Sequence, residues 1–319
     1  MRLFFKYIFS IVLMICFAGY SIQFLSDYGL RKWNNTNYND WENIISGQIN
    51  SDIIINGSSR GYVGYNPIII GGLLNKSCFN IAFDAGGYYL QQSKFDIYLK
   101  KNIKPKIIIQ NIDLAHFNKN VVLPNESQFI PFVNYSDINY FITKYDTKFY
   151  YLRYTPLLKY NQNLKLLKHG LVANFSDLVD KNAKTFQGYC PQNRIFKVDY
   201  HNLKNEIYID KKSILKYKRL LNEIVDFYFS RLDNNAKVIF VWAPEYKLRL
   251  TNDFELKRKA IINEMNLIQK KHRNFYFIDM AYDEIANDNK YYYDTFHLNE
   301  LGSNVFSKKL SVKINKHLN

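Results

Sequence analysis

Cysteine is scarce in this chain of 319 residues, which contains only three. Cys16 lies in an apolar N-terminal run, so only Cys78 and Cys190 remain for the rest of the chain. Two cysteines cannot build a disulfide framework or a zinc site of the CxxC kind. In an oxidising compartment they could form a single bridge, but two separate buried thiols fit the sequence equally well.

Clustered charge is also missing. The chain has 43 Lys and Arg against 28 Asp and Glu, a formal net charge of +15, yet the basic residues are scattered among Asn, Tyr and Ile. This pattern is typical of a solvated basic surface. Proteins that bind nucleic acid usually show a clustered basic stripe or a recognisable module such as a zinc finger, and neither is present. We therefore expect no nucleic-acid partner. Internal repeats and long low-complexity tracts are absent from the sequence as well.

The N-terminus carries the longest apolar run. Residues 7–25 have no charge and match the roughly 20 residues that a membrane-spanning helix needs. Arg2 and Lys6 precede the run and favour a cytoplasmic N-terminus, although Arg31 and Lys32 just beyond it reduce the asymmetry. A cleaved signal peptide is the alternative, but this run is longer than the usual apolar region of one. We expect an uncleaved single-pass anchor in the cell membrane, with the remaining domain on the extracytoplasmic side.

Short apolar runs alternate with helical patterns through the rest of the chain. This alternation predicts an α/β domain with a mostly parallel sheet and helices on both faces. We expect an anchor at 1–26, a lead-in linker at 27–51 and the domain at 52–319. The expected strands lie at 52–56, 78–82, 107–113, 238–243 and 275–278, and apolar residues at helical spacing predict helices over 214–232 and 301–314.

The middle of the chain, about 117–205, breaks this alternation. It is rich in Tyr, Asn and Lys, and Pro131, Pro156 and Pro191 punctuate it. Long additions to a compact domain often serve a function. We interpret this stretch as an insertion that shapes either a substrate face or a surface for a partner.

The sharpest local feature is the sequence IIINGSSRG at 53–61, in which an apolar strand runs directly into small residues. Ligands of open α/β sheets bind at the carboxyl ends of the strands, where such turns lie. Gly57 permits a tight turn, and Ser59 then projects from the start of the next helix. The unpaired N–H groups there can stabilise a developing oxyanion. An ordinary Gly-Ser turn that caps a helix is the structural alternative.

The second feature is the sequence DTFHLN at 294–299, followed by Gly302. Histidine is the usual base for a serine nucleophile, and a carboxylate on its other ring nitrogen fixes the tautomer. Asp294 lies three residues before His297, so the contact can form within one loop. Asn299 is placed to cap the helix that follows. The alternative is a capping Asp with an unrelated surface histidine.

Together these two motifs resemble those of the SGNH/GDSL hydrolase family, here as a membrane-anchored bacterial member. The family's Gly-Asp-Ser motif matches Gly57-Ser58-Ser59, with Ser59 as the nucleophile, and its DxxH motif matches Asp294 and His297. The resemblance covers residue 52 to the end except for the insertion. It implies a three-layer α/β/α sandwich of flavodoxin-like type, a Ser59-His297-Asp294 triad, and neither a cofactor nor a metal.

The same resemblance implies two further oxyanion donors. The sequence NIAFDAGG at 80–87 is similar to the family's second block and points to the amide of Gly86 rather than that of Gly87, with a plain strand-to-helix turn as the alternative. The third block, GxND in the family, is replaced by Gln110-Asn111-Ile112-Asp113, so Asn111 either substitutes for the family's Asn or belongs to the buried sheet. Loss of one oxyanion donor typically costs about 10²–10³ in rate.

Two functions from different classes remain. The first is an extracytoplasmic serine esterase or O-acyltransferase that acts on acyl esters, such as acetyl, of cell-surface glycans. The second is a catalytically inactive relative that binds glycans or assists the assembly of a surface polysaccharide, suggested by the departures from the family motifs at Ser58 and Asn111 and by the large Tyr-rich insertion. A structural membrane protein with chance motifs is a third possibility. It requires Ser59 and His297 to lie far apart.

Overall fold

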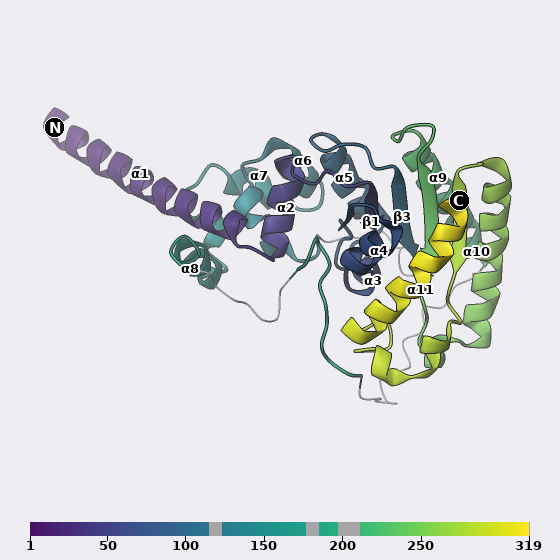
Figure 1. Ribbon diagram of the computed structural model, residues 1–319. Coiled ribbons are helices and arrows are strands. Elements are labelled where there is room, and N and C mark those ends of the chain that lie inside the picture. The colour runs from purple at the N-terminus through teal and green to yellow at the C-terminus, as the bar shows by residue number, and fades with distance from the viewer. Residues whose placement is uncertain (115–122, 177–184, 197–210, 319) are drawn as a thin grey trace. The chain divides into compact units, whose positions relative to one another are not determined.

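The computed structural model describes residues 1–114, 123–176, 185–196 and 211–318. The chain forms two compact units (Figure 1). The N-terminal unit consists of Met1–Ser46 with Val121–Lys184, and the sheet unit consists of Gly47–Asn120 with Thr185–Asn319. The candidate catalytic residues all belong to the sheet unit.

The sheet unit is built on five parallel strands in the order β2-β1-β3-β4-β5. Each expected strand is present, with bounds that differ by at most a few residues. The apolar runs form strands because both faces of a parallel sheet are covered, so that every side chain of β1 and β3 is buried. The strands are β1 (Ile53–Asn56), β2 (Cys78–Asn80), β3 (Ile107–Ile112), β4 (Lys237–Trp242) and β5 (Phe275–Asp279).

One face of the sheet packs against α4 (Pro67–Leu74) and α11 (Glu300–Leu318). Ile53 and Ile55 of β1 belong to this core. The ring of Phe306 on α11 meets Tyr65 edge-on, with 4.9 Å between ring centroids. The apolar spacing over 301–314 therefore predicted a helix whose buried stripe does cover the sheet.

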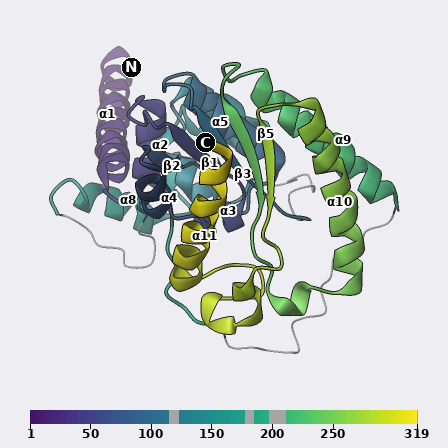
Figure 2. The same ribbon diagram turned by 45° about the vertical axis from the view of Figure 1, so that its right-hand side comes forward.

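The other face is covered by α5 (Tyr88–Leu99), α9 (Lys211–Phe229) and α10 (Asn252–Lys271). Tyr228 of α9 contacts Phe95 of α5 at 5.2 Å and Phe240 of β4 at 6.4 Å between centroids. In Figure 2 the strands run between these helices and α11. The unit is thus the expected three-layer α/β/α arrangement.

The strand order places a switch point beside β1. From β1 the chain passes to β2 on one side, and later to β3 on the other side. The carboxyl ends of parallel strands at such a point border a crevice in which open α/β sheets bind ligands. Polar residues follow four strands at this edge: Ser59 after β1, Asp84 after β2, Asp113 after β3 and Glu245 after β4.

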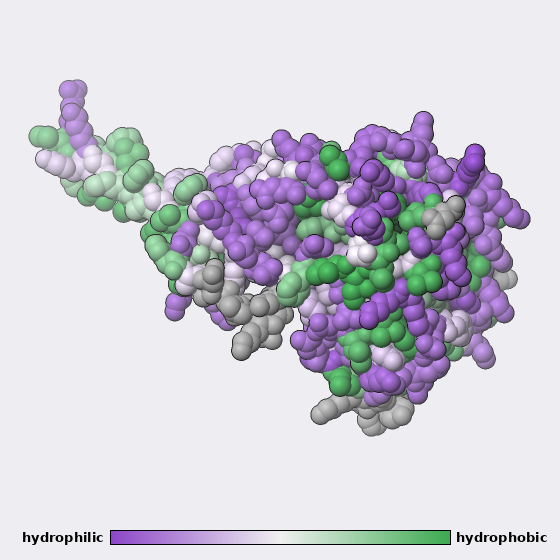
Figure 3. Space-filling model, viewed as in Figure 1, coloured by the Kyte–Doolittle hydropathy of each residue, from purple (hydrophilic) through white to green (hydrophobic). Residues whose placement is uncertain are grey.

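The N-terminal unit is helical. Helix α1 (Arg2–Lys32) is exposed over residues 2–15, and in Figure 3 its projecting half is largely hydrophobic. Within the described residues it is the one helix long and apolar enough to cross a membrane. The unit also contains α2 (Asn37–Ile45), η2 (Glu126–Phe132), α6 (Ser136–Thr143), α7 (Lys148–Leu152), η3 (Leu158–Tyr160) and α8 (Leu164–Val172).

The boundaries of the two compact units differ from those of the expected domains. The expected lead-in, 27–51, mostly continues α1 and forms α2. The expected insertion, 117–205, is divided between the units, and its residues 117–122, 177–184 and 197–205 lie outside the described residues. The reason is tertiary: Asp27 on α1 accepts hydrogen bonds from Lys159 at 2.7 Å and Tyr160 at 2.6 Å. Local sequence patterns do not reveal contacts across more than 130 residues.

Candidate active site

Ser59 is the first residue of the short helix α3 (Ser59–Gly64), which follows β1 after two residues. The Ser58 side chain caps this helix by accepting a hydrogen bond from the Arg60 N–H at 3.3 Å. Gly57 makes the turn possible because a Cβ there would lie 2.9 Å from the Cβ of Asn111 on β3. The backbone thus passes too close to the neighbouring strand for any other residue, and this passage positions Ser59.

Asp294 and His297 lie on the loop between η7 (Asn289–Tyr291) and α11. The Asp294 carboxylate accepts the backbone N–H groups of Phe296 at 2.7 Å and His297 at 2.8 Å. Its other oxygen lies 2.8 Å from Nδ1 of His297. The three-residue spacing is therefore the spacing at which one carboxylate can hold both the backbone and the imidazole of a tight turn.

Two further contacts fix this loop. The Tyr293 ring stacks on the His297 imidazole, with centroids 5.2 Å apart and an interplanar angle of 7°. The Asn299 side chain accepts the Gly302 N–H at 3.0 Å, so it caps α11 as the sequence predicts. The ring of His297 is thereby held by stacking on one side and by a bonded turn at its base.

The structure brings Ser59 and His297 together. Oγ of Ser59 lies 2.8 Å from Nε2 of His297, although 238 residues separate them in the chain. Burial would raise the pKa of Asp294, but hydrogen bonds from His297 and the backbone hold it below its usual value. An ionised Asp294 accepts the proton on Nδ1 and so leaves Nε2 to accept the Ser59 hydroxyl proton.

The two expected oxyanion donors take part in other hydrogen bonds. The Gly86 N–H donates to the Phe83 carbonyl at 2.8 Å and closes a turn. Asn111 is fully buried, where its Oδ1 accepts the Tyr65 hydroxyl at 2.8 Å and its amide donates to Asp113 at 3.4 Å. The role of both residues as oxyanion donors stays a prediction.

The backbone N–H of Ser59 is a further candidate for that role. It belongs to the first residue of α3, where a helix offers no intrahelical acceptor to an N–H group. It also lies on the same residue as the hydroxyl that would attack. A hydrogen-bond donor for an oxyanion beside Oγ is therefore present on the same residue as the nucleophile.

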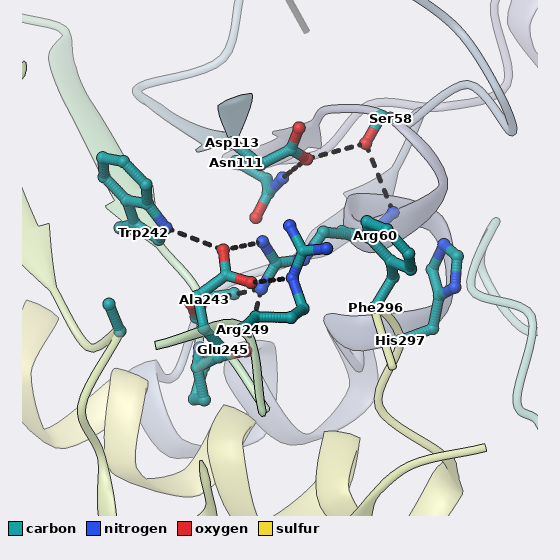
Figure 4. Close-up of polar contacts among 12 residues, drawn as sticks. Ser58, Arg60, Asn111, Asp113, Trp242, Ala243, Glu245, Arg249, Phe296 and His297 are labelled. Atoms are coloured by element: carbon teal, nitrogen blue, oxygen red, sulfur yellow. Dashed lines mark hydrogen bonds and ion pairs between the residues drawn. The ribbon is translucent and has the colours of Figure 1, made fainter. Parts of the chain in front are cut away.

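A buried ion pair joins Arg60, the residue after Ser59, to Glu245 (Figure 4). The Arg60 guanidinium pairs with Glu245 and donates to the carbonyls of Ala243 at 3.3 Å and Pro244 at 2.8 Å. Burial opposes the charge of Arg60, but Glu245 and Asp113 raise its pKa nevertheless. Arg60 thus belongs to the interior of its own unit.

Glu245 is the centre of this buried network. Besides Arg60, its carboxylate accepts the indole N–H of Trp242 and the Arg249 Nε, each at 2.9 Å. Burial alone would raise the pKa of Glu245, but the two guanidinium groups hold it below the usual carboxyl range. A second buried carboxylate, Asp113, accepts the Ser58 hydroxyl at 3.2 Å.

Asp84, Asp113 and Tyr293 border the site but were given no role from sequence. Burial raises the pKa of the Asp84 carboxyl, and the nearby His297 works against that shift. For the two carboxylates a signal was present, because each comes just after an apolar strand on the edge that holds Ser59. Among the described residues, no group of three or more His, Cys, Asp or Glu could hold a metal ion. Cys78 and Cys190 are buried free thiols.

Comparison with known proteins gives distant structural similarity. No family model matches the chain, and no curated protein matches it. A family two carbohydrate esterase from Clostridium thermocellum, solved with cellohexaose, aligns with a TM-score of 0.41 at 11% identity over 83% of this chain and 64% of its own. A carbohydrate esterase family 2 enzyme from Corynascus thermopiles (Myceliophthora fergusii) aligns with a TM-score of 0.45 at 10% identity over 83% and 66%. The chain spans just under two thirds of their length, and similarity at this level assigns no family.

Proposed function

We propose that this protein is a serine esterase or O-acyltransferase whose nucleophile is Ser59. The observation that carries the proposal is the unbroken series of contacts from Ser59 Oγ to His297 Nε2 and from His297 Nδ1 to Asp294, each 2.8 Å long. These three groups come from the two ends of the sheet unit. Such a series has the geometry of a general base beside a hydroxyl nucleophile.

In the proposed reaction Ser59 Oγ attacks an ester carbonyl carbon while His297 Nε2 takes the hydroxyl proton. The N–H of Ser59 stabilises the oxyanion of the tetrahedral intermediate. The ester C–O bond then breaks, and His297 returns its proton to the departing alcohol. Water or an acceptor hydroxyl resolves the acyl-enzyme by the reverse sequence, in which His297 again acts as the base.

The proposed setting is the outer face of the cell membrane. Helix α1 is long and apolar enough to span a bilayer, and Arg2 and Lys6 at its start favour a cytoplasmic N-terminus. The sheet unit would then face surface glycans. Acyl esters of these glycans, acetyl among them, are the substrates we propose, with water as acceptor in an esterase and a sugar hydroxyl as acceptor in a transferase.

A fluorophosphonate probe tests the nucleophile directly. We expect the folded full-length protein to react once, and Ser59→Ala to abolish the reaction. Ser58→Ala is the matched control: this neighbour caps α3 and bonds Asp113, so its loss costs about 1 kcal/mol of stability and leaves labelling intact. Labelling that survives in Ser59→Ala, or no labelling of the folded wild-type protein, would rule the proposal out.

Gly86 and Asn111 already form hydrogen bonds within the protein. This favours a second candidate, an inactive relative that binds glycans or serves in their assembly. This candidate predicts glycan binding that Ser59→Ala leaves unchanged and no turnover of any acyl ester. Calorimetric titration of wild-type and Ser59→Ala protein with acetylated oligosaccharides, together with an assay for released acetate, separates the two. Release of acetate by wild-type protein alone supports the enzyme.

A further inference from the structure

Other segments of the N-terminal unit pack against the part of α1 that lies within the apolar run. Residues 7–25 form this run, but one face of the helix becomes buried from Gly19 onward, and Gln23 is only 2% exposed. Away from this face Phe24 stays 62% exposed. The last turns of the candidate span are therefore covered by protein on one side and open on the other.

Two hydrogen bonds fasten a loop to this part of α1. The Tyr20 hydroxyl donates to the Tyr154 carbonyl at 2.7 Å, and the Leu157 N–H donates to the Gln23 side chain at 2.8 Å. Between them, Pro156 meets Gly19 so closely that a Cβ on the glycine would lie 2.9 Å from it. The loop after α7 is thus held at the depth of the apolar run.

The end of α8 is fastened in the same way. The Asn174 side chain donates to the Leu25 carbonyl at 2.9 Å. Helices α1 and α8 cross at Gly29 and Gly170, where a Cβ on Gly29 would lie 1.9 Å from the Gly170 carbonyl oxygen. Small residues at a crossing let two helix backbones approach closely. Figures 1 and 2 both show α8 beside the C-terminal half of α1.

Exposed apolar side chains stand beside these fastening points. Tyr154 is 57% exposed, Leu158 is 36% exposed and Phe175 is 90% exposed. We call these three residues the docking patch. Because a helix rises 1.5 Å per residue, the attachment points from Tyr20 to Leu25 lie within about 8 Å of the outer end of the apolar run. The boundary between the hydrocarbon core and the outer headgroup layer lies at that level beside a spanning helix.

The charged side chains of the same segment are all basic. Residues 148–176 contain four lysines and one arginine but no aspartate or glutamate. Lys165 and Lys168 are exposed on α8, and Arg153 lies over the Tyr154 ring at 5.1 Å. Aromatic rings beside basic side chains are typical of the membrane interface, where anionic headgroups attract the bases.

We propose that the docking patch, together with Arg153, Lys165 and Lys168, lies in the outer headgroup layer of the membrane, against anionic phospholipid. This inference rests on the anchoring of α1 that forms part of the proposed function. It adds that the N-terminal unit is a second, surface-bound contact with the bilayer. The protein is then held to the membrane by a span and by a partly immersed face.

Nitroxide labels on the full-length protein in nanodiscs test this arrangement. The parent variant is Cys16→Ala, because the other two cysteines are buried. Single cysteines replace Tyr154, Phe175, Phe17 in the apolar run, and Tyr140 on α6. Tyr140 is an exposed residue whose helix makes no hydrogen bond to α1 among the described contacts. Collision rates with oxygen and with a water-soluble nickel chelate report the environment of each label.

We expect the ratio of oxygen to nickel collisions at positions 154 and 175 to exceed that at 140 several-fold, and to fall between the ratios at 140 and 17. Discs with phosphatidylglycerol should raise it further than discs of phosphatidylcholine alone. A water-like ratio at 17 overturns the anchoring itself. A lipid-like ratio at 17 with water-like ratios at 154 and 175 overturns the docking alone. So does protection from both reagents, which would indicate a protein partner or a second copy.

Discussion

Arg60 and Glu245 form a buried ion pair that joins the start of α3 to the end of β4, across 185 residues of the chain. Arg60 is next to Ser59, so the pair holds the helix turn that carries the candidate nucleophile. Glu245 also receives Arg249 and Trp242. This buried network of hydrogen bonds and ion pairs around Glu245 therefore supports the turn that carries Ser59.

Glu245→Gln should destabilise the protein by about 3–5 kcal/mol, because it leaves the buried Arg60 without its counter-ion. Thermal unfolding of the full-length protein in detergent measures the loss. The matched control is Glu223→Gln, which breaks an exposed pair with Arg219 on α9 and should cost about 0.5 kcal/mol or less. Equal shifts in the two variants would contradict the support that we assign to Glu245.

The same carboxylate predicts how stability depends on pH. The folded-state pKa of Glu245 lies below its usual value of 4.5, so its contribution is complete above that value. The contribution is lost as the pH falls through the lower folded-state pKa. We expect the unfolding temperature of wild-type protein to drop more steeply below pH 4.5 than that of Glu245→Gln. Parallel curves would show that other groups dominate the acid limit.

Gly57→Ala should lower both stability and probe labelling, since the added Cβ would meet Asn111 at 2.9 Å and push the Ser59 turn away from β3. The control is Gly72→Ala on α4, where nothing lies within 4 Å of the added Cβ. Alanine is the better helix former, so that variant should gain up to about 1 kcal/mol and label normally. Normal labelling of Gly57→Ala would show that the turn tolerates displacement.

Asp294→Asn should reduce ester turnover by about 10³–10⁴-fold while the protein remains folded. The amide still fits the turn made by the N–H groups of Phe296 and His297, but it no longer fixes the imidazole tautomer or stabilises the imidazolium. Steady-state kinetics on a nitrophenyl ester measure the effect, with His297→Ala beside it. If Asp294→Asn retains full turnover, Asp294 is only a capping residue.

Local patterns were enough for the strands, for α9 and α11 among the helices that cover the sheet, and for the DxxH turn. The five apolar runs form five parallel strands. A strand that is covered on both faces has apolar side chains at every position, so it is visible as a continuous apolar run. The spacing of Asp294 and His297 works locally, since the carboxylate bonds the backbone of its own turn. The apolar run at the N-terminus likewise follows from composition alone.

The tertiary structure decided which groups meet. The distance between Ser59 and His297 depends on the order of the strands and on how α11 packs, and no local pattern encodes either. The same holds for Arg60 with Glu245 and for the use of Asn111 by Tyr65. Local patterns in the sequence predicted the five strands, the apolar N-terminal helix, α9, α11 and the chemical groups of the two motifs. Only the packing of distant segments, which follows from burial and not from spacing, brought those groups into one site.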